Sequence, residues 1–404
     1  MASNELTFNQ ISTLLNAINA QATGKSAIAA TDTYSFVTQA QATLKTGYDP
    51  VLNAISQVLS RTIFSIRPYS AKFRGMMVSP ERYGNHVRKI NIADKTYTDD
   101  DRSALVDGQS MDQQIVNKPN ILQTNFYGEN VFQDSYTIFR DQLDVAFSSP
   151  EEFGRFVSMI VGNASDKLEQ SRENLSRALL ANYIGAKIVT AGNAIEDSES
   201  VVHLLTEYNT LCGLTGDDAL TSSTVYLPAN FKPFMQWVYS RVATLSALLT
   251  ERLTKFHVNP TISDVAKPIM RHVPYERQRV YLYAPAQFQL EAQVLADTFH
   301  DNYLRYADHE TVNFWQSART RDKVIVHPNY MLANGTYGYT TQDVEQAGVF
   351  GIIMDEEACG FTPVNQWQQP APFNARGGYT TVWIHETQRH WTDMTESGII
   401  LLLD

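Results

Sequence analysis

Residues 149–185 of the chain read SPEEFGRFVSMIVGNASDKLEQSRENLSRALLANYIG, and they contain the strongest local signal in the sequence. Ser149 followed by Glu152 forms a capping box, and Pro150 occupies the first helical position. Apolar residues then recur every three or four positions and form one stripe as far as Tyr183. The pattern predicts a long amphipathic helix.

The predicted helix covers residues 150–184 and would span about 50 Å at 1.5 Å per residue. A single apolar stripe on so long a helix indicates that it lies across a sheet as a spine. Gly154 and Gly162 weaken the helix, and a break near Gly162 is compatible with the sequence. Gly185 can end it.

Upstream of this helix, residues 69–130 differ in composition from the rest of the chain. Of these 62 residues, 22 are apolar and 16 are charged, whereas the whole chain is 43% hydrophobic and 19% charged. Strand-like patterns at residues 87–97 and 121–127 predict a long two-stranded excursion. Such an excursion cannot bury enough surface to be stable alone, so we expect the same chain or a neighbouring copy to cover it.

The charges of this excursion are separated along the sequence. Residues 72–95 hold six basic side chains against two acidic ones, and residues 99–112 hold five aspartates against Arg102. One interpretation is a solvated hairpin. The other is a dipolar arm that docks on a complementary copy, because charge complementarity fixes register and partner.

The two ends of the chain have different patterns. Residues 1–60 predict short amphipathic helices around Leu15 and Leu52, joined by a small-residue stretch that looks poorly packed. Residues 225–231 and 280–288 each predict a strand that stops at a proline able to start a helix. The C-terminal quarter is rich in predicted strands, and the last, 399–403, is apolar on both faces, which is typical of a central, covered strand. The mixture predicts an α+β fold.

The overall composition excludes several classes of protein. The chain has 404 residues, and 43 acidic against 32 basic side chains give a formal charge of −11, which argues against tight binding of DNA phosphates. No apolar run is long enough to span a membrane, and we expect no secretory signal. Cys212 and Cys359 are too few for a disulfide framework or a zinc site, and the simplest expectation is that both are small buried residues.

No local catalytic or metal-binding motif is complete. Gly24-Lys25-Ser26 lacks the first glycine of a phosphate-binding loop, and Gly108 to Asp112 lacks the second glycine of a nucleophile elbow. Residues 99–110 lack the glycine and glutamate of a calcium loop, although a loosely held divalent cation at Asp99–Asp101 stays open. The nine histidines form no pair at metal-ligand spacing. We therefore predict no catalytic residue, no metal and no cofactor.

The order of these segments resembles a known family, the major capsid proteins of tailed bacteriophages with the Hong Kong phage-type capsid fold. The resemblance rests on residues 141–147 leading into the capped helix, on Asn374–Tyr379 and Trp391–Glu396, and on the apolar ending Ile399–Leu403. It covers the layout of nearly the whole chain, although each motif is short.

The resemblance implies a division of the chain. It predicts an N-terminal arm (1–68), an extended loop (69–132) that overlaps an adjacent subunit, a peripheral domain (133–199 and 346–404) with the spine helix, and an axial domain (200–345). The subunit-interface residues predicted from the charge pattern and the helix start are Arg88, Lys89, Lys95, Asp99, Asp100, Asp101, Arg102, Glu151 and Glu152.

The resemblance also implies partners. We expect other copies of the chain in pentamers and hexamers, a separate scaffolding protein, a portal, and non-specific contact with packaged double-stranded DNA, but no membrane. The location would be the virion capsid, after synthesis in the cytoplasm of the bacterial host.

Three other functions remain compatible with the sequence. A cellular encapsulating shell would share the fold and differ in cargo and genomic setting. A cytoplasmic α/β enzyme could use a dispersed site lined by the aromatic residues of 303–315. A sugar- or surface-binding β protein, such as a phage tail component, is favoured only by the strand-rich C-terminus.

Overall fold

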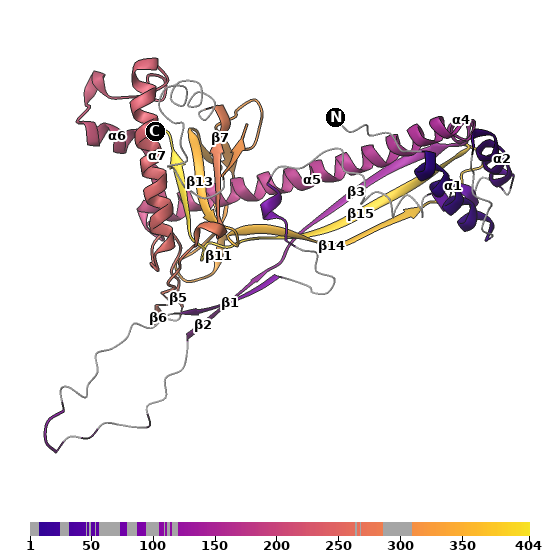
Figure 1. Cartoon of the computed structure of the whole chain (residues 1–404). Helices are drawn as coiled ribbons and strands as arrows, with labels where there is room; N and C mark the ends of the chain where they lie inside the picture. Colours follow the sequence, from indigo (N-terminus) through magenta and orange to yellow (C-terminus); the bar gives the residue numbers. More distant parts are fainter. Residues whose placement is uncertain are drawn as a thin grey trace.

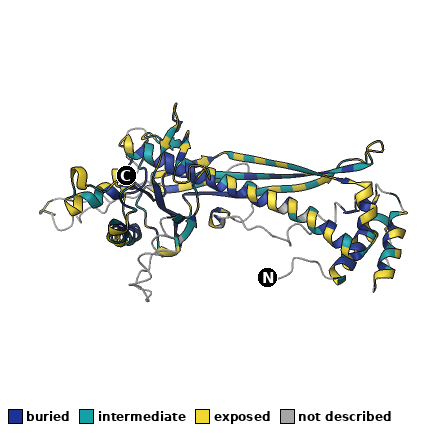
Figure 2. Cartoon of the chain, turned by 90° about the horizontal axis from the view of Figure 1, so that it is seen from above, coloured by how far each residue is buried: buried dark blue, intermediate teal, exposed yellow. Residues whose placement is uncertain are grey.

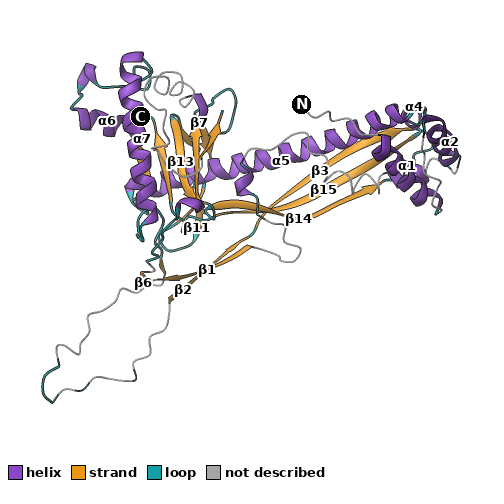
Figure 3. Ribbon diagram, in the orientation of Figure 1, coloured by secondary structure: helices purple, strands orange, loops and turns teal. Residues whose placement is uncertain are grey.

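A computed structural model shows an elongated subunit built on one helix, α5 (Pro150–Gly192) (Figure 1). A cluster of short helices lies at the start of α5, and a second body of helices and sheet surrounds its end (Figure 3). The mixed helix and sheet content confirms the α+β class. The residues that the structure describes are 8–24, 32–45, 47, 50–52, 54–55, 73–78, 87–93, 105–108, 110, 114, 120–262, 265–266, 268–285 and 309–404.

Helix α5 begins as the sequence predicts and ends later. The Ser149 hydroxyl accepts a hydrogen bond from the backbone N–H of Glu152 (3.2 Å), and Pro150 is in the first turn. The helix then runs for 43 residues without a break at Gly162. The prediction that Gly185 ends it is wrong, because that glycine serves packing: a Cβ atom there would lie 2.5 Å from Val326 Cγ2.

This close contact gives a test of two glycines in one helix. Gly185→Ala is expected to destabilise the subunit by about 1–3 kcal/mol, because the added methyl group overpacks a filled contact. Gly192→Ala is the matched control: a Cβ there meets nothing within 4 Å, and alanine favours the helix. Urea unfolding of both variants measures the difference, and equal stability of the two would contradict the packing role.

Helix α5 covers one face of a long antiparallel sheet with the strand order β14 (Cys359–Pro370), β15 (Tyr379–Thr392), β3 (Gly128–Phe139). Alternate residues of β15 are buried, including Val382, Ile384 and Glu386, while Trp383 points to the other face and is 38% exposed. The burial alternates visibly along the strands (Figure 2). The predicted arrangement of a spine across a sheet is confirmed.

The second sheet has five strands, in the order β4 (Val201–His203), β16 (Gly398–Leu402), β13 (Val349–Asp355), β7 (Gln278–Tyr283), β8 (His309–Val312). Ile399 and Leu401 pack in the cluster that contains α7 (Pro228–Thr250) and the start of α6 (Leu204–Cys212). Ile400 and Leu402 pack in the cluster that contains α5. The last strand is therefore central and covered on both faces, as its apolar sequence predicts.

This sheet joins segments from both predicted domains. Strands β4, β7 and β8 come from the predicted axial range, whereas β13 and β16 come from the predicted peripheral range. The boundaries at 200 and 345 remain a prediction. In the described part of the chain, strands from both predicted domains belong to this one sheet.

The N-terminal region is more ordered than its composition indicates. Helices α1 (Phe8–Thr23) and α2 (Thr33–Leu44) pack with α4 (Arg140–Ala146) and the first turns of α5. The stretch expected to be poorly packed contains α2, in which Phe36, Ala40 and Thr43 are buried. That expectation is wrong for α2, because an Asp32 cap starts the helix and its few apolar residues share one face, while residues 25–31 of the stretch lie outside the described residues.

The remaining elements are short. They are β1 (Val87–Ala93), β2 (Asn120–Phe126), β5 (Thr261–Ile262), β6 (Val265–Ala266), β9 (Val324–Val326), β10 (Asn329–Met331), β11 (Tyr337–Tyr339), β12 (Val344–Gln346), and 3-10 turns at Arg74–Met76, Ser198–Ser200, Gly216–Asp218 and Tyr275–Arg277. In the described part of the chain, no helix is long and apolar enough to cross a membrane.

Two further sequence expectations need correction. Residues 225–227 are turns and not a strand, although α7 begins at Pro228 as predicted. The turn buries Val225 in the cluster around α7 and leaves Leu227 54% exposed. Cys359 is buried as expected, but Cys212 is exposed at the end of α6.

Candidate assembly surfaces

Strands β1 and β2 of the extended loop form a two-stranded hairpin with two unlike faces. Strands β1 and β2 are antiparallel, and Lys89 pairs with Thr124 while Ile92 pairs with Ile121. Because paired residues project to the same side, the register divides the hairpin into two sets. The inner face contains Val87, Lys89, Asn91, Leu122, Thr124 and Phe126, and the outer face contains Arg88, Ile90, Ile92, Ile121, Gln123 and Asn125.

The inner face is attached to the same chain. The Lys89 ammonium lies 3.0 Å from a carboxylate oxygen of Asp393, contacts Glu396, and lies 3.4 Å from Glu357. Burial by itself would lower the pKa of Lys89, but the carboxylates of Asp393 and Glu396 raise it above its usual value. Lys89 is therefore held charged, as part of an ion cluster at the root of the hairpin.

The outer face carries three exposed isoleucines among its polar residues. Ile90, Ile92 and Ile121 are 53%, 61% and 56% exposed. The hairpin projects from the body of the subunit (Figure 1). A cluster of three exposed isoleucines on a strand pair indicates a surface that another molecule covers.

A second exposed apolar surface lies on the long sheet, on the face opposite α5. Trp367 and Trp383 are 44% and 38% exposed, and Val131 on the neighbouring strand is 62% exposed. The Trp367 ring stacks on His385, with the ring centroids 4.0 Å apart.

The predicted interface residues fall into three groups. Arg88 is on the outer face of the hairpin, and Lys89 is in the ion cluster of its own chain. Glu151 is exposed in the first turn of α5, and Glu152 pairs with Arg155 (3.3 Å) far from the hairpin (Figure 1). Lys95, Asp99, Asp100, Asp101 and Arg102 lie outside the described residues. Whether any of the nine contacts another copy stays a prediction.

Sequence reasoning missed the isoleucines and the acidic partners of Lys89. The alternation Arg88-Lys89-Ile90-Asn91-Ile92 contains the first signal, because it places apolar residues on one face of a predicted strand. Asp393 and Glu396 carry no comparable signal, since their proximity to Lys89 arises only in three dimensions.

Helix α5 is fixed to the rest of the subunit by buried charges. Arg172 forms a bidentate pair with Glu386 on β15 (2.9 and 3.1 Å) and also bonds Glu169 (3.0 Å). Farther along, Arg177 pairs with Glu173 (2.8 Å) and donates to the carbonyl oxygen of Phe314.

The end of α5 carries a fully buried lysine. Lys187 pairs with Glu196 and donates to the carbonyl oxygen of Phe256 (2.6 Å). Burial lowers the pKa of Lys187, and Glu196 opposes that shift. Specific polar contacts thus hold α5 to the long sheet through Glu386 and to the backbone at Phe314 and Phe256, in addition to apolar packing.

His257 lies beside this lysine and makes stability depend on pH. It is 1% exposed, and burial, followed by the charge of Lys187, lowers its pKa to about 4. Between the unfolded value near 6.5 and this folded value, the unfolded chain binds the proton and the folded chain does not. Stability should therefore fall as the pH falls through this window, by roughly 3 kcal/mol in total from this group.

Replacing the histidine tests that assignment. His257→Gln is expected to flatten the pH dependence of urea unfolding between pH 8 and pH 5 relative to the unchanged chain. Parallel curves for the two proteins, with or without a constant offset from altered packing, would show that His257 does not cause the loss of stability in acid.

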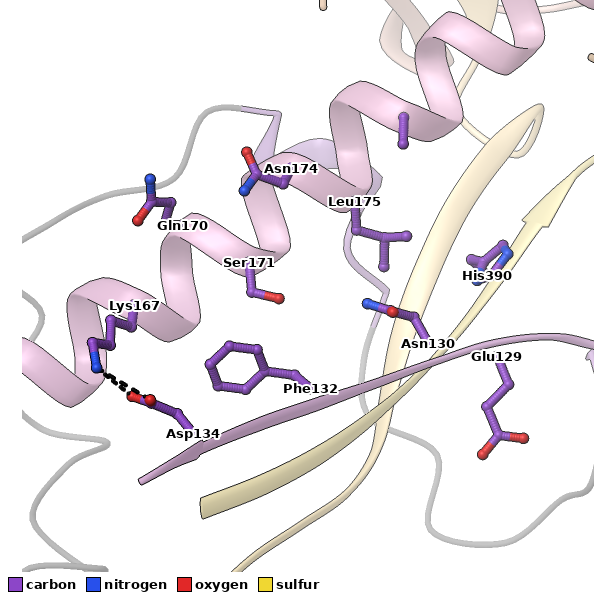
Figure 4. A pocket seen from close by; sticks show the side chains of 11 residues that line it. Glu129, Asn130, Phe132, Asp134, Lys167, Gln170, Ser171, Asn174, Leu175 and His390 are labelled. Atoms are coloured by element: carbon purple, nitrogen blue, oxygen red, sulfur yellow. Dashed lines mark hydrogen bonds and ion pairs between the residues drawn. The ribbon is translucent and has the colours of Figure 1, made fainter. Parts of the chain in front are cut away.

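A groove of about 530 Å³ lies between α5 and the edge strand β3 (Figure 4). Phe132 and Leu175 line its apolar part, and Lys167 pairs with Asp134 (2.9 Å) at one end. Its remaining lining residues are Glu129, Asn130, Gln170, Ser171, Asn174, Ala178 and His390. Among the described residues, no cluster of three or more His, Cys, Asp or Glu side chains could hold a metal ion. The groove presents no recognisable catalytic set.

A spine helix over a long sheet, a second α/β body and a projecting hairpin define the class of protein: it has the capsid fold of the Hong Kong phage type. One similar solved structure is the capsid of Staphylococcus phage Andhra, with 13% identity, a TM-score of 0.54, and coverage of 85% of this chain and 86% of that chain. Another is a chain in the structure of the head fiber and inner core protein of bacteriophage P68, with 13% identity, a TM-score of 0.50, and coverage of 84% and 86%. At this identity the likeness shows the fold alone.

The chain belongs to the Phi29-like phage major capsid protein family, whose model matches residues 14–396. No curated protein sequence matches it significantly. The protein is therefore a structural subunit of a phage capsid shell and not an enzyme. The resemblance inferred from the sequence is confirmed, and the enzyme, cellular shell and tail-component alternatives are not favoured.

Proposed function

We propose that the chain builds the shell from pentamers and hexamers, with the axial domain (200–345) at their centres and the extended loop (69–132) overlapping an adjacent copy. The single observation that carries the proposal is the two-faced hairpin. Its inner face is attached to its own chain through Lys89 and Asn91, while its outer face exposes Ile90, Ile92 and Ile121.

The surface that receives the hairpin is the exposed face of the long sheet in the next copy, around Trp367 and Trp383. Both surfaces expose large apolar side chains, and docking would remove these side chains from water. A contact between two different surfaces of identical chains is heterologous, and such contacts close into rings when the rotation between copies allows it. This supports capsomers of five and six subunits.

Charged residues add specificity to this contact. Arg88 borders the isoleucines, and we propose that it acts with Lys95, the acidic run Asp99–Asp101 and Arg102 to select the register of docking. Glu151 and Glu152, at the start of α5, would serve a second contact, in the peripheral domain and beside the arm (1–68).

The other partners follow from the role of a shell subunit. We propose assembly in the bacterial cytoplasm with a separate scaffolding protein and a portal, and non-specific contact with the packaged double-stranded DNA. The formal charge of −11 supports an inner wall that encloses DNA without gripping its phosphates.

Electron microscopy of the purified chain tests the proposal. We expect rings of five or six subunits, or closed shells, in negative stain at high protein concentration, with a larger yield of shells when the scaffolding protein is present. A chain that stays monomeric under both conditions would contradict assembly through capsomers.

A further inference from the structure

We propose that the turn formed by residues 393–397, between β15 and β16, is a shared anchor that couples the position of the hairpin to the position of the segment around Arg271. This coupling is a property of the single subunit, so it does not depend on which surfaces meet in the shell. We call residues 393–397 the anchor turn.

The hairpin reaches the anchor turn through two side chains of β1. Lys89 pairs with Asp393 (3.0 Å) and with Glu396. The amide nitrogen of Asn91 donates to the hydroxyl of Thr395 (3.2 Å). Asn91 is 5% exposed, so this bond is shielded from water.

Arg271 reaches the same turn from the other side. Its guanidinium lies 2.9 Å from Glu396 and donates to the backbone oxygen of Thr395 (3.3 Å). The same guanidinium donates to the side-chain oxygen of Asn91 (2.7 Å). Arg271 is itself held to the segment after α7, because its backbone exchanges two hydrogen bonds with Leu253 (2.8 and 2.9 Å).

The anchor turn is buried and is hydrogen-bonded both within itself and to α5, and we infer from this that a movement of one attached segment is passed to the other. Its five residues are at most 3% exposed. The Asp393 carboxylate accepts bonds from the Thr395 backbone N–H (2.8 Å) and hydroxyl (2.7 Å), and Tyr183 on α5 donates to the backbone oxygen of Glu396 (3.2 Å). The spine helix therefore fixes the turn, and both neighbours bind to a fixed point.

The shared partners make the two attachments interdependent. Glu396 serves both Lys89 and Arg271, and Arg271 serves both Glu396 and Asn91. Burial raises the pKa of Glu396 above its usual value, and the charges of Lys89 and Arg271 both oppose that shift. A movement of Arg271 away from the turn removes one ion pair of Glu396 and one hydrogen bond of Asn91. Because both residues also hold the hairpin to the anchor turn, that attachment becomes weaker.

Hydrogen exchange of the unassembled full-length chain tests the coupling. Arg271→Met is expected to speed amide exchange in β1 and β2 by about tenfold, although no hairpin residue is changed. In the reciprocal direction, Lys89→Met should speed exchange at the Leu253 and Arg271 amides, because a coupling between two sites acts equally both ways. The double variant should lose less protection than the sum of the two single effects.

The matched control is Arg241→Met. Arg241 also belongs to the predicted axial domain and forms a half-buried pair with a glutamate, Glu207 (2.8 Å), but it does not contact the anchor turn. It should leave exchange in β1 and β2 unchanged. Arg271→Lys, which keeps one charge but has fewer donors, should give an intermediate rate and remains usable if the methionine variant does not fold.

Unchanged exchange in β1 and β2 of a folded Arg271 variant would overturn the proposal. So would equal acceleration in all strands, including β3 and β15, because that would report general loss of stability. Strictly additive effects of Lys89→Met and Arg271→Met would show two independent attachments.

Discussion

Replacing Ile90 and Ile92 together by lysine is expected to abolish particle formation and leave the subunit folded. Both side chains are more than half exposed, so the change costs the isolated subunit little. In the shell, the variant would lose the burial of two isoleucines, each worth about 1.5–3 kcal/mol when fully buried, and would bury two ammonium groups without partners. Because each subunit repeats the loss, a modest change per contact prevents closure of the whole shell.

The measurement combines circular dichroism with particle counts by electron microscopy or sedimentation. The matched control is Ile90→Val with Ile92→Val, which keeps an apolar outer face and should assemble like the unchanged chain. Normal particles from the lysine variant would show that the outer face is not a contact surface. Loss of the folded signal would instead mean that the isoleucines support the subunit itself.

Arg172→Met should destabilise the subunit by about 3–5 kcal/mol. Glu386 is completely buried, and two of its hydrogen bonds come from Arg172. Removing the guanidinium leaves a buried carboxylate whose remaining described donor is Gln388. The spine would then be loosened from the long sheet at the centre of their contact.

Urea unfolding of the unassembled subunit measures this loss. Arg155→Met is the control on the same helix, because its pair with Glu152 is exposed and should change stability by less than about 1 kcal/mol. Adding Glu386→Gln to Arg172→Met should restore part of the stability, since the unpaired charge disappears. Equal losses for Arg172→Met and Arg155→Met would contradict a structural role for the buried pair.

The elements predicted best were those whose signals are local. The Ser149 cap, Pro150 and the apolar stripe predicted α5 because capping and helical periodicity act within one or two turns. The apolar run 399–403 likewise predicted a covered strand, because a strand buried on both faces has no polar alternation. Gly185 shows the limit of such reasoning, since its role depends on Val326, which is distant in the sequence.

The candidate site was predicted only in outline. The charge and strand pattern located the hairpin and drew attention to Arg88 and Lys89, but it did not separate the inner face from the outer one. That distinction needs the register of β1 on β2, and it needs the position of residues 393–397, which contact the inner face. The acidic run at Asp99–Asp101 lies outside the described residues, so its docking role remains a prediction.

By itself, the sequence determined the α+β class, the spine helix, the central final strand and a segment too charged and too poor in apolar residues to stand alone. Tertiary structure alone decided which charges meet. Lys89 and Glu396 are 307 positions apart, and Asn91 and Thr395 are 304 apart. Helix caps and periodicity depend on neighbours a few residues away, whereas an ion pair depends on the path of the whole chain, which packing of the spine and both sheets fixes.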